Sequence, residues 1–248
     1  MLRAFFIAVL LLFSTEPVRA AAPLHLVFDI DWTLVYPLPS KPPFPDALTV
    51  EVEGKWYRFA DDAAEVVAEA ASSPDYRLSF FSGGTMSRNR ELLKRLMLPD
   101  GRSALDASVQ VLGFDDLSPG DTRPGARFSE RWKKDLTKIE PNLNNVVLFE
   151  DIPHFHTTEQ KANLLWIGPT YDYAPSFEAG VLAGGEKKFT PPHHAAWRRE
   201  KSKLQRSLAI VKRARAETAG RPELFLERMQ TLRTGGDCGF LFTRLLSR

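Results

Sequence analysis

The sequence contains a single cysteine, Cys238, among 248 residues. One thiol forms no intramolecular disulfide and builds no thiolate metal site, so a disulfide scaffold and a zinc finger are both excluded. The chain also has no low-complexity tract and no apolar run long enough to span a bilayer as a stable anchor. With 44% hydrophobic and 26% charged residues, the composition is typical of one globular α/β domain with a modest appendage.

The two charge signs are concentrated in different parts of the chain. Residues 1–185 carry 18 basic and 25 acidic side chains, a net charge of −7, whereas residues 186–248 carry 15 and 6, a net charge of +9. We therefore expect a folded domain over residues 21–185 and a basic helical C-terminal extension over residues 186–248.

Residues 1–20 are typical of a secretory signal peptide. Arg3 gives a positive start, residues 4–13 form a short apolar run, and Val18 and Ala20 supply the small residues that precede a cleavage site. An uncleaved amphipathic or anchoring helix is the alternative. The pattern predicts cleavage and export to the periplasm or the extracellular space, with no stable membrane span in the mature chain.

Apolar runs of strand length alternate with amphipathic stretches, which predicts an α/β fold with a parallel sheet flanked by helices. Asp62 and Glu65 form a capping-box pattern at the start of the first helix. The expected strands cover residues 24–28, 78–81, 109–112, 146–149 and 164–167. The expected helices cover residues 62–72 and 132–139, and a further helix carries an apolar stripe of Leu92, Leu93, Leu96 and Met97.

A small flap is expected between the first two strands. After a proline-rich loop at residues 37–45, apolar residues lie on both sides of Gly54 in the pattern of a β-hairpin. This hairpin and the predicted helices occupy the chain from Thr33 to Ser82 and from Ser82 to Lys134. Because no room is left for a large cap domain, we expect an open site.

Acidic and hydroxyl side chains follow three of the predicted strands directly. Residues 29–33 (D-I-D-W-T) follow the first strand, Ser82 and Gly83 follow the second, and Glu150 and Asp151 follow the fourth. Open α/β sheets bind their ligands at the carboxyl ends of the strands, so we expect these side chains to meet at one edge.

In this order the segments resemble the four motifs of the haloacid dehalogenase (HAD) superfamily. Residues 29–33 resemble motif I, residues 80–82 (F-F-S) motif II, residues 132–136 (W-K-K-D-L) motif III and residues 146–151 (V-V-L-F-E-D) motif IV. Motifs III and IV are most similar to the NIF-like branch, which contains RNA polymerase C-terminal-domain phosphatases. The resemblance covers about residues 24–170 and implies a Rossmann-like parallel sheet.

The resemblance also implies a role for each polar residue. Asp29 is expected to attack phosphorus and form an aspartyl-phosphate, and Asp31 to act as the general acid and base. Ser82 and Gly83 are expected to bind the phosphate oxygens. Lys134, rather than the adjacent Lys133, is expected to bind phosphate and to neutralise charge in the transition state.

A Mg²⁺ site of Asp29, Asp31 and Asp151 is implied in the same way, with the main-chain carbonyl of Ile30 as a further ligand. Glu150 stands where the family usually has Asp. We expect its longer side chain to orient the motif III lysine instead of binding the metal.

Trp32 also departs from the small or acidic residue common at its position in the family. Its indole has two interpretations: an apolar wall beside the leaving group, or core packing against the flap.

These features predict an exported, Mg²⁺-dependent phosphatase acting on phosphomonoesters. Capless members of the superfamily act on bulky phosphoesters, so the expected partner is a phosphorylated and even polymeric substrate. Two alternatives stay open. One is a catalytically idle binding module, and the other is a protein that binds nucleic acid or a membrane surface through residues 186–248.

The basic extension carries its own pattern. Trp197, Leu204, Leu208 and Val211 recur at helical spacing and predict a helix whose apolar stripe docks on the sheet domain. The other face is basic. One interpretation is that this basic face is simply solvated. The other hypothesis is that it attracts polyanionic phosphoesters electrostatically.

The signal-peptide interpretation predicts that the exported chain begins at Ala21, because Val18 and Ala20 supply the small residues and Pro23 disfavours a cut two residues later. Mass spectrometry of the exported chain measures its first residue directly. A cytoplasmic chain that retains Met1 would contradict the prediction.

Overall fold

The fold is described from a computed structural model that covers residues 22–43, 45–182 and 189–235. The predicted signal peptide at residues 1–20, part of the basic extension and Cys238 lie outside the described residues.

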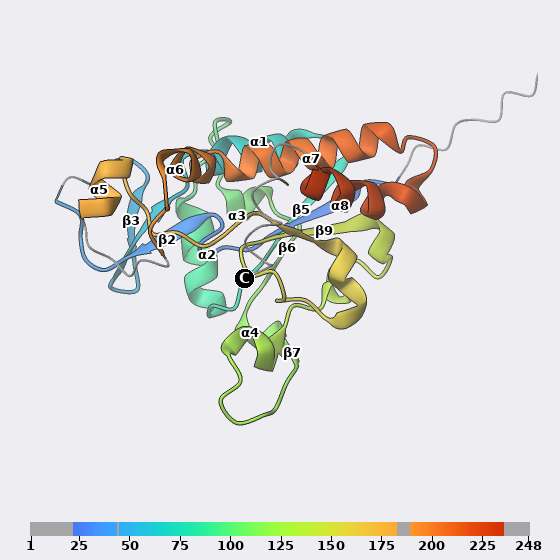
Figure 1. Cartoon of the computed structure of the whole chain (residues 1–248), viewed down its shortest axis with the longest axis horizontal. Helices are drawn as coiled ribbons and strands as arrows, with labels where there is room; N and C mark the ends of the chain where they lie inside the picture. The colour runs from blue at the N-terminus through green and yellow to red at the C-terminus, as the bar shows by residue number, and fades with distance from the viewer. Residues whose placement is uncertain (1–21, 44, 183–188, 236–248) are drawn as a thin grey trace, which may run out of the picture.

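A parallel five-stranded sheet with the order β10-β9-β1-β5-β6 forms the centre of the molecule (Figure 1). All five residues of β1 are buried, as expected for a central strand that is covered on both faces. The α/β fold and its five strands were predicted from the sequence and are confirmed. The strands are β1 (Leu24–Phe28), β5 (Tyr76–Phe81), β6 (Gln110–Leu112), β9 (Val146–Glu150) and β10 (Leu164–Trp166).

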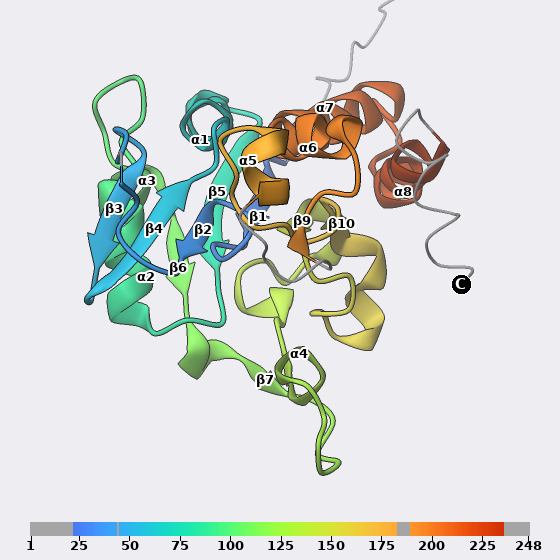
Figure 2. The ribbon, with the colours of Figure 1, turned by 60° about the vertical axis from the view of Figure 1, so that its left-hand side comes forward.

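Helices cover one face of this sheet and shorter segments cover the other. Phe28 and Phe149 stack at 4.3 Å between ring centroids in the larger core cluster, which also contains buried residues of the helices. Leu136 and Phe155 cover Val27 on the opposite face. Figure 2 shows α1 and α7 above the sheet and the arm with α4 and β7 projecting below it. The helices of the first part of the chain are α1 (Ala63–Ser72), α2 (Met86–Arg95), α3 (Ala104–Ala107), α4 (Phe128–Arg131) and α5 (Phe177–Leu182).

A small antiparallel sheet forms the flap between β1 and β5. Its strands are β2 (Val35–Leu38), β3 (Thr49–Val52) and β4 (Lys55–Phe59), in the order β2-β4-β3. The hairpin around Gly54 is confirmed, and both turn residues have positive φ, 50° at Glu53 and 71° at Gly54. The third strand, β2, was not predicted, because its Pro37 reads as the start of a loop.

The helix predicted at residues 132–139 is wrong. Trp132–Lys133 form the short strand β8, which pairs with β7 (Ser118–Pro119), and a 3₁₀ turn follows at Leu136–Lys138. The Asp135 side chain accepts the amide of Thr137 and so caps this turn locally. Tertiary contacts therefore override the helical spacing of the apolar residues.

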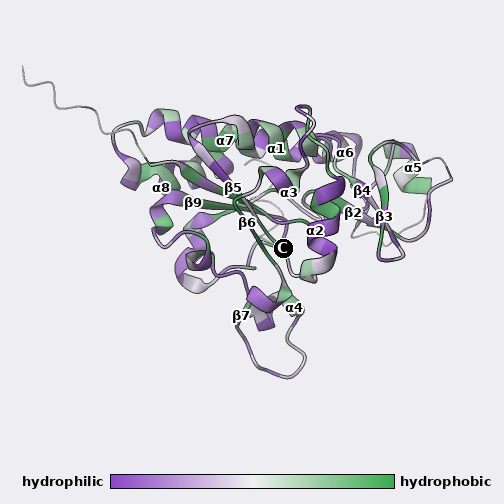
Figure 3. Ribbon diagram, turned by 180° about the vertical axis from the view of Figure 1, so that it is seen from behind, coloured by the Kyte–Doolittle hydropathy of each residue, from purple (hydrophilic) through white to green (hydrophobic). Residues whose placement is uncertain are grey.

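The C-terminal extension docks on the sheet domain. Leu204, Leu208 and Val211 are buried in the main core, which confirms the predicted docking for these three residues. Trp197 of the predicted stripe lies in a separate helix that ends at Glu200, and it is only half-buried. The described part of the chain contains no helix that is long and apolar enough to cross a membrane. In Figure 3 the hydrophobic strands lie inside, while hydrophilic residues mark the outer helix surfaces. The extension comprises α6 (His194–Glu200), α7 (Lys203–Glu217) and α8 (Phe225–Gly235).

Part of the basic charge on the extension is paired with acidic side chains. Lys201 lies 2.9 Å from Asp61, which precedes α1 in the sheet domain. Lys212 pairs with Glu69 of α1. These ion pairs fix the extension to the domain, and they reduce the positive charge that faces solvent.

Asp62 caps a different helix from the one expected. Its carboxylate makes no capping bond in α1, so the capping-box prediction with Glu65 is wrong. Instead Oδ2 of Asp62 accepts the amides of Leu204, at 3.1 Å, and Gln205, at 3.0 Å, in the first turn of α7. A buried acceptor at this position satisfies two N–H groups that the helix itself leaves unpaired.

We predict that Asp62→Ala lowers the free energy of unfolding by about 1–2 kcal/mol at pH 5, since α7 loses its cap. The matched control is Glu65→Ala, which removes an exposed side chain and is expected to cost less than about 0.5 kcal/mol. Urea denaturation of the two variants measures the difference. Equal losses would show that the capping contact is unimportant.

The same residue gives a pH signature. Burial raises the pKa of Asp62 from 3.8 to about 6 in the folded chain, although amide hydrogen bonds oppose the shift. The folded state therefore binds the proton more tightly than the unfolded state, and the contribution of Asp62 to stability falls as pH rises from about 4 to about 6. In Asp62→Asn that part of the pH dependence should disappear.

Candidate active site

Three strand ends bring the predicted polar residues together. Asp29 follows β1, Ser82 follows β5 and Asp151 follows β9, and all three side chains are buried. The parallel register pairs Phe28 with both Phe80 and Phe149, so the three strands end at the same edge of the sheet. This is the placement that the sequence predicts from the alternation of strands and polar residues.

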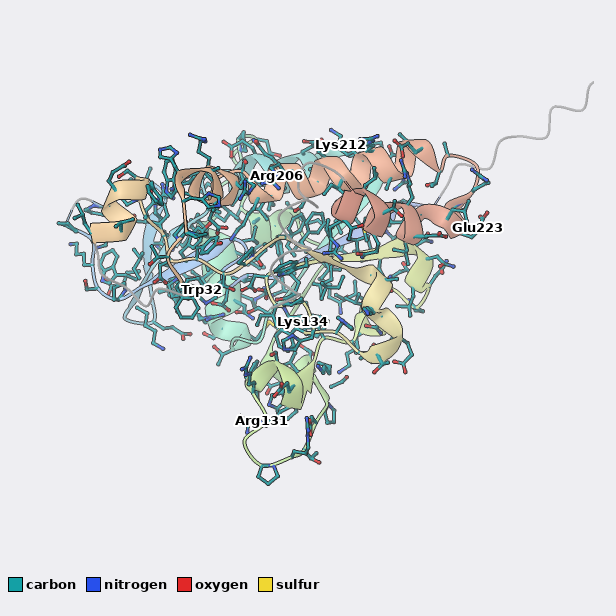
Figure 4. The ribbon with its side chains drawn as sticks, in the orientation of Figure 1. Trp32, Arg131, Lys134, Arg206, Lys212 and Glu223 are labelled. Carbon is teal, nitrogen blue, oxygen red and sulfur yellow. The ribbon has the colours of Figure 1, made fainter. Side chains whose placement is uncertain are left out.

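Lys134 lies at the centre of this edge (Figure 4). Its Nζ is 2.5 Å from Oδ1 of Asp29 and 2.6 Å from Oε2 of Glu150, and its side chain is fully buried. Lys133 points elsewhere, because its Nζ donates to the carbonyls of Ser129 and His154. The structure therefore places Lys134, and not Lys133, beside Asp29, and it places Glu150 on Lys134 as expected.

Two buried carboxylates, those of Asp29 and Glu150, contact this ammonium group, and a third carboxylate lies close to them. One oxygen from each of Asp29, Glu150 and Asp151 lies within 4.8 Å of the others. Burial raises the pKa of Asp29 to about 7 against the opposing charge of Lys134, and burial also raises the pKa of Glu150 well above its usual value. The site thus has an excess of buried negative charge, which a divalent cation would offset.

Hydrogen bonds within the site determine which carboxylate oxygens remain available to a cation. Both oxygens of Glu150 are used, Oε2 by Lys134 and Oε1 by the amide of Ile152 at 3.0 Å. Oδ2 of Asp151 accepts from the Thr170 hydroxyl, which leaves Oδ1 of that carboxylate. Oδ2 of Asp29 accepts a long and therefore weak hydrogen bond, 3.4 Å, from the Thr33 hydroxyl. Two hard carboxylate oxygens of this kind fit Mg²⁺.

Two of the expected metal ligands lie elsewhere. The Ile30 carbonyl accepts the amides of Leu34 and Val35, both at 2.9 Å, inside a tight turn. It is therefore not available to a cation, contrary to the expectation. The Asp31 carboxylate also lies outside the acidic group formed by the described residues.

Asp31 is held by Arg88, a residue of α2 that the sequence did not single out. The guanidinium donates to both carboxylate oxygens, with Nη1–Oδ1 at 2.9 Å and Nη2–Oδ2 at 2.5 Å, and the Ser82 hydroxyl donates to Oδ2 at 3.0 Å. Burial lowers the pKa of Arg88, but the Asp31 carboxylate outweighs burial and the net shift is upward. The Asp31 carboxylate thus keeps the Arg88 guanidinium protonated beside Ser82.

Close packing explains the glycines after β5. A Cβ on Gly84 would lie 2.0 Å from Nη2 of Arg88, so only glycine allows the guanidinium to reach Asp31. The Gly84 amide donates to the Ser82 hydroxyl at 3.1 Å. A Cβ on Gly83 would lie 2.8 Å from the ring of Phe128, which packs against this turn.

The Trp32 indole does not stand free as a wall beside the site, and its contacts extend beyond the flap. Its indole stacks on Phe189 at 5.8 Å between ring centroids, and it also contacts the main core. Its main-chain carbonyl accepts a hydrogen bond from Nζ of Lys203 in α7. The sequence gives no signal for these contacts, because Phe189 and Lys203 are far from Trp32 along the chain.

No protein-family model and no curated protein matches the sequence. Among solved structures, the chain is similar to Fcp1, an essential RNA polymerase II CTD phosphatase, with 17% identity, a TM-score of 0.43 and coverage of 76% of this chain. A variant of fission yeast Fcp1 bound to beryllium fluoride gives 16% identity, a TM-score of 0.42 and coverage of 77%. The match spans only 54% and 56% of those two chains.

We predict that Lys134→Met lowers the free energy of unfolding by about 3–5 kcal/mol in EDTA, because the buried carboxylates of Asp29 and Glu150 lose the ammonium group that both contact. Mg²⁺ should restore part of this loss, since it supplies the missing positive charge. Lys133→Met is the matched control and should cost less than about 1.5 kcal/mol, the value of ordinary hydrogen bonds. A larger loss in Lys133→Met would contradict the placement of the two lysines.

Proposed function

We propose that this protein is an exported, Mg²⁺-dependent phosphatase of the HAD type that hydrolyses phosphomonoesters through an aspartyl-phosphate on Asp29. The observation that carries the proposal is the convergence of Asp29, Lys134, Asp151, Ser82 and an aspartate at position 31 on one sheet edge. A buried carboxylate with a fixed ammonium beside it has the elements of a nucleophile for phosphoryl transfer.

The first step is attack by Asp29 on phosphorus. Lys134 donates to Oδ1 of Asp29, and the Asp29 carboxylate forms the new P–O bond as the ester P–O bond breaks. When bound by Asp29 and Asp151, Mg²⁺ supplies the charge that offsets repulsion between carboxylate and phosphate. The Ser82 hydroxyl and the Lys134 ammonium are the groups that hydrogen-bond the phosphate oxygens.

Asp31 carries the proton in both steps. It protonates the leaving oxygen during attack, and it then takes a proton from the water that hydrolyses the aspartyl-phosphate and releases inorganic phosphate. In the structure both oxygens of Asp31 are held by Arg88. We infer that substrate phosphate draws this guanidinium toward itself, so that a freed oxygen of Asp31 takes up a proton from solvent before it donates that proton to the leaving oxygen.

The substrate class follows from the surroundings of the site. In the described residues, the three-stranded flap and α1 are the elements that lie between β1 and β5, and they form no separate cap domain. A site without a cap domain suits a phosphate on a bulky molecule. Export of the chain, which the N-terminal sequence favours, places such substrates outside the cytoplasm.

We predict that residues 21–248 hydrolyse p-nitrophenyl phosphate with Mg²⁺ and lose the activity in EDTA. Asp29→Asn should abolish turnover, because the nucleophile is gone. Asp31→Asn should lower kcat by about 10²- to 10⁴-fold, the usual contribution of general acid–base catalysis, with Mg²⁺ affinity retained.

The control for these variants is Asp100→Asn, which alters a surface aspartate paired with Arg102 and should leave kcat unchanged. Acid-quenched phosphoenzyme measures the intermediate directly. Phosphoenzyme or full turnover in Asp29→Asn would overturn the mechanism, and a folded, Mg²⁺-binding wild type without turnover would favour an idle binding module.

A further inference from the structure

Trp32 has an unusual backbone conformation for a bulky residue. Its φ is 60°, in the left-handed region, where a Cβ is sterically disfavoured. The residue lies between Asp31 and Thr33, so it belongs to the loop that carries both proposed catalytic aspartates. Its amide donates to the carbonyl of Val35 at 2.7 Å, which closes the turn on one side.

A residue from the C-terminal extension holds the other side of this turn. Nζ of Lys203 donates to the Trp32 carbonyl, across 171 positions of sequence. Lys203 is only 3% exposed, so its ammonium is not satisfied by bulk water. The indole of Trp32 is held separately, by its stacking on Phe189.

The lysine is itself fixed by a buried acid. Oε1 of Glu200 lies 2.6 Å from Nζ of Lys203 and accepts the hydroxyl of Tyr36, in β2, at 2.8 Å. Glu200 is 8% exposed. A buried ion pair requires further hydrogen bonds to be tolerated, and the Trp32 carbonyl supplies one of them. The charged pair and the strained turn therefore stabilise each other.

We propose that Lys203, oriented by Glu200, is a positioning residue that holds the left-handed turn at Trp32 and so sets the geometry of Asp31 and Thr33. The effect on catalysis rests on the proposed phosphatase function. The Trp32 carbonyl belongs to the peptide that leads to Thr33, whose hydroxyl faces Asp29, and Asp31 is the preceding residue. A shift of this peptide moves both groups.

The test removes the contact without leaving a buried charge alone. Glu200→Gln with Lys203→Met deletes both charges and keeps much of the side-chain volume. We expect kcat to fall by about 10- to 100-fold with KM little changed, because displacement of a positioned group by about 1 Å has effects of this size.

The same double substitution is then made in a chain that also carries Trp32→Gly. Glycine adopts positive φ without steric conflict, so the turn no longer needs the lysine. In that background the double substitution should lower kcat by less than about threefold. Equal losses of kcat in the two backgrounds would overturn the proposal, since they would indicate only general loosening of α6 and α7.

Lys201→Met is the matched control for that loosening. Lys201 binds Asp61 and lies over the ring of Tyr173, so it docks the same segment without touching Trp32. Its replacement should leave kcat within about twofold of the wild type. A fall in kcat equal to that of the double variant would also overturn the proposal.

Amide hydrogen exchange separates this proposal from the proposed function. In the double variant, exchange at the Trp32 amide should rise by about tenfold or more, while Lys201→Met leaves it unchanged. This readout does not depend on turnover. Unchanged exchange at Trp32 would overturn the positioning role, whereas an inactive wild type with the expected exchange pattern would overturn only the phosphatase proposal.

Discussion

The buried ion pair between Lys134 and the carboxylates of Asp29 and Glu150 is the interaction on which the rest of the structure depends. Two strands, β1 and β9, end in carboxylates that the sheet buries at one edge, and each buried charge needs a partner. Lys134 reaches them because its own amide donates to the carbonyl of Phe155. The segment that covers the second face of the sheet therefore also delivers the counterion.

The sheet and the position of the acidic residues could be predicted because their signals are local. A run such as Leu24–Phe28 has apolar residues at every position, which indicates a strand covered on both faces. Once the strands are known, residues directly after them, such as Asp29 and Asp151, must lie at the same edge. Periodicity and chain order suffice for this part of the site, and no side-chain geometry is needed.

The remaining parts of the site arise from contacts that no spacing encodes. Arg88 is one of several basic residues in α2, and only the turn at Gly84 brings it to Asp31. The segment around Lys134 has helical spacing, but Asp135 caps a 3₁₀ turn and strand pairing takes the preceding residues. Asp62 likewise precedes one helix in sequence and caps another in space. In each case the final position depends on contacts with residues distant in the sequence, which the local pattern does not reveal.

The C-terminal extension shows why net charge alone does not identify a binding surface. Its first long helix is fixed at both sides of its N-terminus, by Asp62 on its amides and by Lys203 on the Trp32 carbonyl. Lys201 and Lys212 form ion pairs with acidic residues of the sheet domain. Because these cations serve internal contacts, the excess positive charge of residues 186–248 overstates what is free to meet a polyanion. The extension is better understood as a part of the structure that holds the loop between β1 and the flap.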